Sequence, residues 1–406
     1  MTSFTNMFRM KQDFAQRNTV IDILRALTML LMIFVNDFWT VRGVPHWMQH
    51  ARSNEDFLGL SDVVFPLFLF VVGMSIPYAI ERRFSKGCSE LSTVSHILTR
   101  TFALLIMGIF TVNTESGISN DIMINRDLFM VLMIVAFLLI WNVYPKKENN
   151  HRHLFTSLQI AGVLILLYLA FIFRDSKGGI MQIRWWGILG IIGWTYLVSS
   201  FIYLFIRDRI LPLFFVWLGF ILLCMVKSSQ LIPAESFING LLGIVNIGTG
   251  AHMAFTVGGI LFTLVIVKYS HVAARQKILF LVTVTTLLLI AAMISNNFWI
   301  ISKNMGTLPW VLYCSAAAVG LYGLLHWAVY NGKASWFNVI KPAGTATLTC
   351  YLMPYLLYSL LFGFLNLSLP VWMKEGLPGL IKCALFAFLS IGVTAILIRY
   401  RIKIKV

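Results

Sequence analysis

The sequence predicts an all-α membrane protein in which about ten to twelve helices cross the bilayer and both termini lie in the cytoplasm. Composition is the first reason. Of the 406 residues, 59% are hydrophobic and only 12% are charged, whereas soluble proteins are about half apolar and a quarter charged. The second reason is that long apolar runs recur along the whole chain. The third is that Lys and Arg gather in alternate connecting segments.

Twelve apolar runs are candidates for spans, because a helix of about 17 to 25 apolar residues matches the hydrocarbon core. We expect them at 19–39, 57–80, 97–113, 127–144, 154–173, 185–206, 210–226, 249–268, 278–296, 309–330, 342–366 and 379–398. No Pro-, Gly- or Ser-rich linker divides the chain, so residues 1–406 are expected to form a single transmembrane domain.

The distribution of basic residues predicts the orientation, because positively charged loops stay in the cytoplasm during insertion. With the N-terminus inside, the inner segments hold 21 of the 32 Lys and Arg residues. These segments are 1–18, 81–100, 145–153, 207–209, 268–277, 331–341 and 399–406. The loop with His46 and His50 then lies on the outer face. Topology and anionic lipid also account for the net charge of +16, so no nucleic-acid partner is expected.

The five cysteines have no spacing typical of disulfides or metal sites. Cys88 lies in an inner loop, and the others lie in or beside apolar runs, where they are expected to act as small hydrophobes. We therefore expect no metal.

Polar residues gather at one membrane edge. Asn36 ends the first span, His50 lies in the following loop, and Asp62 opens the second span. An imidazole can take a proton from an attacking amine or hydroxyl, and a carboxylate can hold the ring in one tautomer. The alternatives are a loop histidine, an N-capping Asp62 and an Asn36 that binds its own helix end. Asp37 and His46 have no comparable set of polar residues around them in the sequence, so they are not predicted site residues.

Pro66 sharpens the interpretation of Asp62. Proline has no N–H to return to the carbonyl four residues earlier, so the carbonyl of Asp62 is left free. Gly73 and Pro77 loosen the same span further. A broken helix lining a polar cavity is therefore expected.

Two other groups of polar residues each have a structural and a functional interpretation. Asp22 and Arg25 lie on one helix face, where they pair with each other or Arg25 binds a substrate or cofactor. Ser302, Lys303 and Asn304 precede a later span, where they bind an anion or sugar hydroxyls, or form only a polar turn before Pro309.

The sequence resembles the heparan-α-glucosaminide N-acetyltransferase family of transmembrane acyltransferases and its bacterial relatives. It is most specific in residues 20–80 and 298–312. The spans at 185–226 look like an extra hairpin where the family's animal enzyme carries a loop. The matching motifs are Asp22-Ile-Leu-Arg25, Leu31-Met-Ile-Phe-Val-Asn36, His50-Ala51, Ser61-Asp62-Val-Val-Phe65-Pro66, Ile301-Ser-Lys303-Asn304 and Pro342-Ala-Gly344-Thr-Ala-Thr-Leu-Thr-Cys-Tyr351.

The resemblance implies transfer of acetyl from cytosolic acetyl-CoA to an amino sugar or glycan acceptor on the outer side. It implies that His50 is the general base, with Asn36 and Asp62 as catalytic partners. Lys303, Asn304, Ser302 and Arg25 are the expected binding residues. Direct transfer is favoured over an acetyl-histidine intermediate, because bringing both substrates to one point supplies proximity. The phosphates of the coenzyme need cations. The inner segments supply Arg82, Arg83, Lys86, Arg100, Lys268 and Lys341; which of them bind stays open, and the alternative for most is a charge that sets the topology and faces lipid.

The competing function class is a transporter or flippase for a sugar-derived or lipid-linked solute. Twelve spans would suit one, but buried acids for ion coupling are scarce and no symmetry between halves is visible. The sequence does not decide the identity of the acceptor, whether a nitrogen or an oxygen is acetylated, or the length of the acyl chain. A homodimer is also left open. The short ends of the chain favour a bacterial inner membrane.

Overall fold

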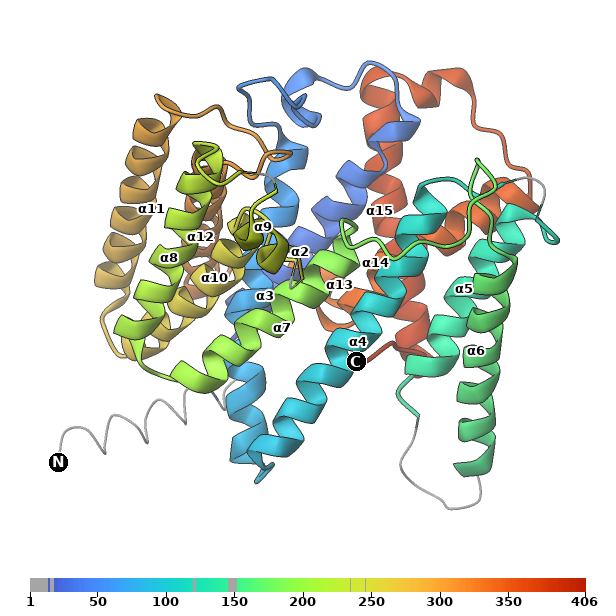
Figure 1. Cartoon of the computed structure of the whole chain (residues 1–406), viewed down its shortest axis with the longest axis horizontal. Helices are drawn as coiled ribbons and strands as arrows, with labels where there is room; N and C mark the ends of the chain where they lie inside the picture. The colour runs from blue at the N-terminus through green and yellow to red at the C-terminus, as the bar shows by residue number, and fades with distance from the viewer. Residues whose placement is uncertain (1–13, 15–17, 120–121, 145–151, 234, 245) are drawn as a thin grey trace. The chain divides into compact units, whose positions relative to one another are not determined.

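The computed structural model describes residue 14 and residues 18–119, 122–144, 152–233, 235–244 and 246–406. The basic segments predicted at 1–18 and 145–153 lie largely outside these residues. Within the described ranges every regular element is helical, and β-pairing is limited to isolated bridges (Figure 1). The predicted all-α class is confirmed.

The helices follow one another along the chain. They are α2 (Thr19–Asn36), α3 (Leu60–Ser85), α4 (Glu90–Glu115), α5 (Arg126–Trp141), α6 (Arg152–Ile172), α7 (Ile188–Ile206), α8 (Ile210–Ser228), α9 (Phe237–Ile244), α10 (Ala251–Lys268), α11 (Ala274–Asn296), α12 (Leu308–Tyr330), α13 (Phe337–Thr345), α14 (Thr347–Tyr358) and α15 (Gly376–Arg399). Short 3-10 turns are η1 (Phe38–Thr40), η2 (His46–Met48) and η5 (Val371–Lys374), and the π-helical turn η4 (Ser359–Phe364) continues α14.

Each of the twelve predicted runs forms a helix. Among the described residues, 11 helices are long and apolar enough to cross a membrane. This number lies within the predicted ten to twelve spans and confirms an integral membrane protein. The remaining run forms α5, whose 16 residues rise about 24 Å at 1.5 Å per residue. The short helix α9 was not predicted.

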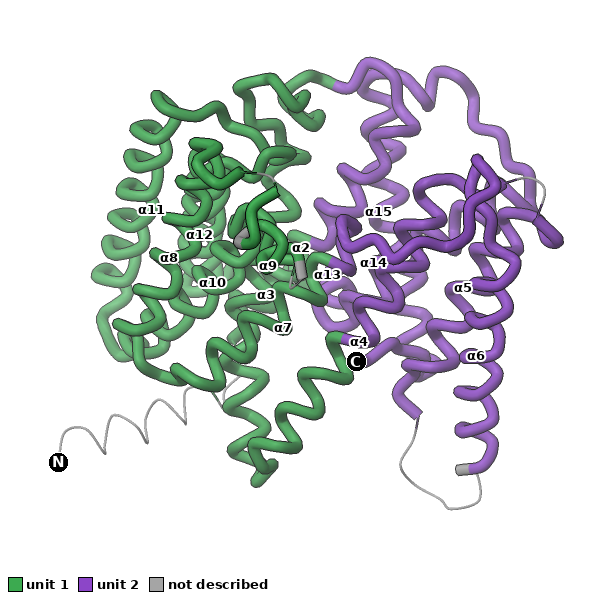
Figure 2. The backbone as a smooth tube through the Cα atoms, in the orientation of Figure 1, with its two compact units in different colours: residues 1–28, 45–101, 191–338 green, residues 29–44, 102–190, 339–406 purple. Residues whose placement is uncertain are grey.

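The chain divides into two compact units, each built from three separate stretches (Figure 2). Unit 1 comprises residues 1–28, 45–101 and 191–338, and unit 2 comprises the rest. The helices α2, α4, α7 and α13 each contribute residues to both units. No single cut in the sequence therefore separates the units, and the single transmembrane domain stays a prediction.

In unit 1, α3 packs along α10 and also contacts α12. A Cβ atom at Gly73 would lie 2.0 Å from the carbonyl oxygen of Thr256, and one at Gly259 would lie 2.1 Å from that of Phe70. Glycine at both positions lets the two backbones touch, as small residues do between membrane helices.

The helix α3 is continuous, so the prediction of a broken span after Asp62 is wrong. Its hydrogen bonding explains the difference. The carbonyl freed by Pro66 finds donors on another helix, as described below, and Gly73 serves close packing against α10.

In unit 2, α5 packs against α6, and α14 with η4 packs against α5. A Cβ atom at Gly363 would lie 2.2 Å from the Asp127 carboxyl carbon, so glycine lets η4 approach the start of α5. The chain end is tied to the unit as well. The N–H of Lys403 donates to the Asn142 side chain at 2.9 Å, and that of Ile404 donates to the Thr349 hydroxyl at 3.0 Å.

Candidate functional site

The loop that carries His50 is bound tightly to the start of α3. The Ser61 hydroxyl donates to the carbonyl of Met48 at 2.6 Å. A Cβ atom at Gly59 would lie 1.8 Å from the carbonyl oxygen of Gln49. Only glycine therefore permits this approach of the two backbone segments, and the loop holds His50 beside Asp62.

His50 and Asp62 form the expected contact. The Nδ1 atom of His50 lies 2.6 Å from Oδ1 of Asp62, and the N–H of Ala51 donates to the other carboxylate oxygen at 2.8 Å. In the tautomer with the proton on Nδ1, the carboxylate accepts a hydrogen bond from the ring and Nε2 has a free lone pair. The Asp62 side chain is 2% exposed and that of His50 is 52% exposed. This arrangement suits a general base whose partner is shielded from water.

The backbone carbonyl of Asp62 is bound from α12, so the prediction that Pro66 frees it is confirmed. Nε1 of Trp310 donates to this oxygen at 3.1 Å, and Sγ of Cys314 lies 3.8 Å from it. Trp310 is fully buried. Asp62 thus contacts His50 through its side chain and α12 through its backbone.

Lys303 joins this pair from the turn before α12. Its Nζ lies 3.2 Å from Nδ1 of His50 and 3.9 Å from Oδ1 of Asp62. Burial lowers the pKa of the Lys303 ammonium, and the negative charge of Asp62 partly opposes this. A cation held here beside a carboxylate can donate to an anionic oxygen.

The neighbours of Lys303 differ in what they contact. The Asn304 amide donates to the Ser53 hydroxyl at 3.1 Å, which ties the turn to the loop after His50. Ser302 is buried, and its hydroxyl accepts the N–H of Met305 at 3.3 Å. Its own N–H donates to the Thr307 hydroxyl at 3.0 Å. Ser302 therefore shapes the turn.

Arg25 lies away from this cluster within unit 1. It pairs with Asp22 at 3.2 Å, as one alternative predicted, and donates to the Ser75 hydroxyl at 2.7 Å. Ser75 follows Asp62 by 13 residues of α3, a rise of about 20 Å. The structure does not bring Arg25 to His50.

The other conspicuous polar residues at the membrane edge have partners of their own. Nε2 of His46 lies 2.8 Å from the Glu55 carboxylate, and the Asp37 carboxylate accepts from Lys382 at 2.8 Å. His252 lies in α10 with its ring against Phe65. None of these contacts involves His50.

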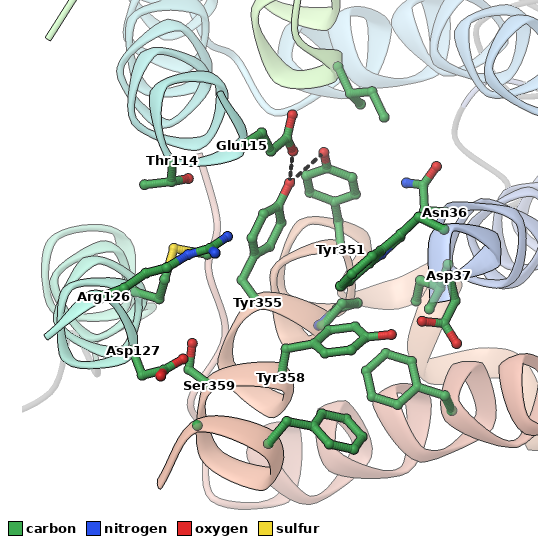
Figure 3. Close-up of a pocket in the computed structure, with 18 residues that line it drawn as sticks. Asn36, Asp37, Thr114, Glu115, Arg126, Asp127, Tyr351, Tyr355, Tyr358 and Ser359 are labelled. Carbon is green, nitrogen blue, oxygen red and sulfur yellow. Dashed lines mark hydrogen bonds between the residues drawn. The ribbon is translucent and has the colours of Figure 1, made fainter. Parts of the chain in front are cut away.

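Asn36 belongs to unit 2, where its exposed side chain lines a cavity of about 710 Å³ (Figure 3). Its grouping with His50 therefore stays a prediction. The labelled polar and aromatic residues around the cavity come from α2, the residue after it, α4, α5, α14 and η4: Asn36, Asp37, Thr114, Glu115, Arg126, Asp127, Tyr351, Tyr355, Tyr358 and Ser359. Tyr355 donates to the Glu115 carboxylate, and its hydroxyl oxygen lies 3.3 Å from that of Tyr351.

Most residues of this cavity were not predicted from the sequence, although two features of the sequence pointed to them. Glu115 is the last residue of α4, and Arg126 and Asp127 are the first of α5, so charges lie at the ends of apolar runs. Tyr351 and Tyr355 lie four residues apart, on one helix face.

Comparison with known proteins supports the predicted resemblance. The chain is 34% identical over 104 residues to heparan-alpha-glucosaminide N-acetyltransferase of Mus musculus, which is 25% of this chain and 15% of that protein. It is 35% identical over 94 residues to the Homo sapiens protein of the same name, which is 23% of this chain and 13% of that protein. Each match thus spans less than a sixth of the relative.

A family model described as "Domain of unknown function (DUF5009)" matches residues 17–230. This range holds α2 and α3, and with them Asn36, His50 and Asp62. Because the match covers more than half of the 406 residues, the chain belongs to the DUF5009 family.

Proposed function

We propose that the protein is a transmembrane acetyltransferase that moves acetyl from cytosolic acetyl-CoA to an amino sugar or glycan acceptor on the outer side. The observation that carries the proposal is the contact of His50 with the buried carboxylate of Asp62 at 2.6 Å. The names of the mouse and human relatives support the reaction class. The excess of basic residues in the inner segments supports cytoplasmic termini. The proposed location is a bacterial inner membrane.

The proposed chemistry is direct transfer. The acceptor nitrogen or oxygen attacks the thioester carbonyl while Nε2 of His50 takes its proton, and the charge on Asp62 stabilises the imidazolium that forms. The new bond to the acetyl carbon forms as the carbon–sulfur bond breaks. The imidazolium then returns the proton to the leaving thiolate, which departs as the free thiol of coenzyme A.

The remaining site residues have proposed roles in charge stabilisation and binding. Lys303, 3.2 Å from the His50 ring, is suited to donate to the oxygen that becomes negative during attack. The resemblance gives Asn36 the same task through its amide. Asn304 and Ser302 position the turn that carries Lys303. Arg25 is proposed as a binding residue from the resemblance alone.

The test uses purified protein in proteoliposomes with radiolabelled acetyl-CoA and a panel of amino sugars and glycans. Wild type is expected to transfer label, and His50→Ala is expected to reduce transfer by about 100- to 10,000-fold, as for loss of a general base. His46→Ala is the matched control, because His46 binds Glu55 in the same loop and not Asp62. Full transfer by His50→Ala would refute the role of His50. A wild type that binds no acetyl-CoA would favour a transporter. Labelled His50 trapped without acceptor would overturn direct transfer.

A further inference from the structure

Another cavity lies wholly within unit 1, at the opposite end of α3 from Asp62. Its volume is about 320 Å³, and its wall comes from the starts of α2 and α11, the ends of α10 and α12, and Tyr78 of α3. Tyr78 follows Asp62 by 16 residues of α3, a rise of about 24 Å. These helix ends border the segments 268–277 and 331–341, which are predicted to face the cytoplasm. The cavity is therefore separate from the His50 site.

Lys277 brings a positive charge to this cavity. Its Nζ donates to the backbone carbonyl of Ser270, which uses one of its three N–H groups. In the described part of the chain Lys277 forms no salt bridge, and the described lining residues include no Asp or Glu. A cation beside a cavity without carboxylates favours an anionic ligand.

His326 adds a second hydrogen-bonding group to the same wall. Its ring stacks on that of Tyr322, with the centroids 6.2 Å apart and the planes 6° apart. Tyr322 is 2% exposed, so it supports the imidazole from a fixed position. Neither ring nitrogen forms a hydrogen bond with another described residue, and the charge of Lys277 acts on this imidazole. An anion beside both side chains can accept a hydrogen bond from each.

Aromatic and basic side chains around these helix ends indicate the level of lipid head groups. Tyr269 and Trp327 are each 48% exposed, and Tyr330 is 68% exposed. The Nζ atom of Lys333 lies 5.4 Å from the centre of the Trp327 ring. Trp and Tyr concentrate at the interface between membrane and water, and basic pockets between helices at this level bind phosphate head groups. The position of the cavity therefore suits a lipid phosphate.

The apolar surroundings favour a lipid over a soluble phosphate compound. Val20, Leu281 and Val329 line the cavity beside the polar groups. Leu279 and Val282 of α11 are 65% and 56% exposed, so acyl chains have an apolar surface to pack against. The volume lies near the lower end of the roughly 300–1,000 Å³ typical of small-molecule sites. It suits a head group better than a whole coenzyme.

We propose that this cavity binds the phosphate of an anionic phospholipid, with Lys277 and His326 as the donors and the acyl chains along α11. The site does not depend on the proposed acetyl transfer. The bound lipid connects the start of α11 with the end of α12. Because it binds the folded protein, it also raises the stability of unit 1 in anionic membranes.

The test is native mass spectrometry of the full-length protein in detergent with dioleoylphosphatidylglycerol and dioleoylphosphatidylcholine. These lipids have the same chains, but only the first carries a net negative charge. Phosphatidylglycerol is expected to bind at least about 10-fold more tightly than phosphatidylcholine, the equivalent of about 1.4 kcal/mol. Lys277→Gln and His326→Phe are each expected to reduce its affinity by about 10-fold, and His326→Phe keeps a ring against Tyr322. Lys333→Gln removes the same charge at the same end of unit 1 outside the cavity and is the matched control. Unfolding temperatures confirm that each variant is folded.

Competition identifies the source of the phosphate. An excess of acetyl-CoA or of inorganic phosphate is expected to leave phosphatidylglycerol bound. Displacement by either compound would assign the cavity to a soluble phosphate and overturn the lipid proposal. Equal affinity for the two lipids, or Lys277→Gln and His326→Phe proteins that bind phosphatidylglycerol as tightly as the Lys333→Gln control, would overturn it as well. Selective binding that persists in His50→Ala supports the site, whether or not the protein transfers acetyl.

Discussion

The bond from Trp310 to the carbonyl of Asp62 can be tested through its relation to Pro66. Pro66 cannot return an N–H to that carbonyl, and Trp310 supplies the donor at 3.1 Å. Trp310→Phe leaves the buried oxygen with the Cys314 thiol at 3.8 Å as its only donor among the described residues, and a thiol is a weak donor. The expected loss is about 1–3 kcal/mol for an unsatisfied buried acceptor, plus the cost of the smaller ring.

Pro66→Ala supplies the missing donor from within α3. An alanine at this position has an N–H that can reach the carbonyl four residues earlier in a helix that is continuous from Leu60 to Ser85. In that background, the oxygen no longer depends on Trp310. Trp310→Phe should therefore destabilise the Pro66→Ala protein less than it destabilises the wild type, by about 1–3 kcal/mol.

The assay is the free energy of unfolding of the four proteins, measured by titration with sodium dodecyl sulfate in mixed micelles. The change in ring volume is the same in both backgrounds, so it cancels in the double-mutant cycle. A coupling energy within about 0.5 kcal/mol of zero would mean that the two changes are independent. That result would refute the account in which Pro66 makes the bond from α12 necessary.

Two further perturbations test the loop and the lysine. Gly59→Ala places a Cβ 1.8 Å from the Gln49 carbonyl oxygen. It should therefore displace the His50 loop and lower acetyl transfer at least about 10-fold, as small misplacements of a base do. Gly219→Ala, with nothing within 4 Å, is the control, and equal activity of Gly59→Ala and wild type would contradict the account in which Gly59 lets the loop pack against α3. The pKa of Lys303 is lowered in the folded state, so the unfolded chain binds more protons between that pKa and about 10.4, and stability rises with pH across this window. Lys303→Met should flatten this rise in unfolding temperature, and an unchanged slope would assign it to other groups.

The positions of the spans and the partner of His50 were predictable because both depend on local information. Apolar runs set the helices, and Asp62 at the start of a span directly after the loop has few other directions for its carboxylate. The consequence of Pro66 followed from covalent structure alone. The identity of the donor that replaces the lost N–H did not follow, because Trp310 is 248 residues away.

The cavity of unit 2 was not predictable for the same reason. Glu115 and Tyr355 are 240 residues apart in the sequence, and each has an ordinary explanation where it occurs. The broken helix was wrongly predicted because Gly73 has two uses in membrane helices. It can loosen a backbone, or it can let two backbones meet, and only the position of α10 decides between them.

Asp62 is expected to keep the geometry of the proposed base unchanged when the helices slide. Its carbonyl is attached to α12, and the turn that carries Lys303 leads directly into the same helix. A displacement of α12 along the membrane normal therefore carries the carboxylate and the lysine in the same direction, and the His50 loop follows through its bonds to Ser61 and Asp62. The imidazole and both of its charged neighbours then move as one body, so we expect Nε2 of His50, the proposed proton acceptor, to keep its surroundings in bilayers of different thickness.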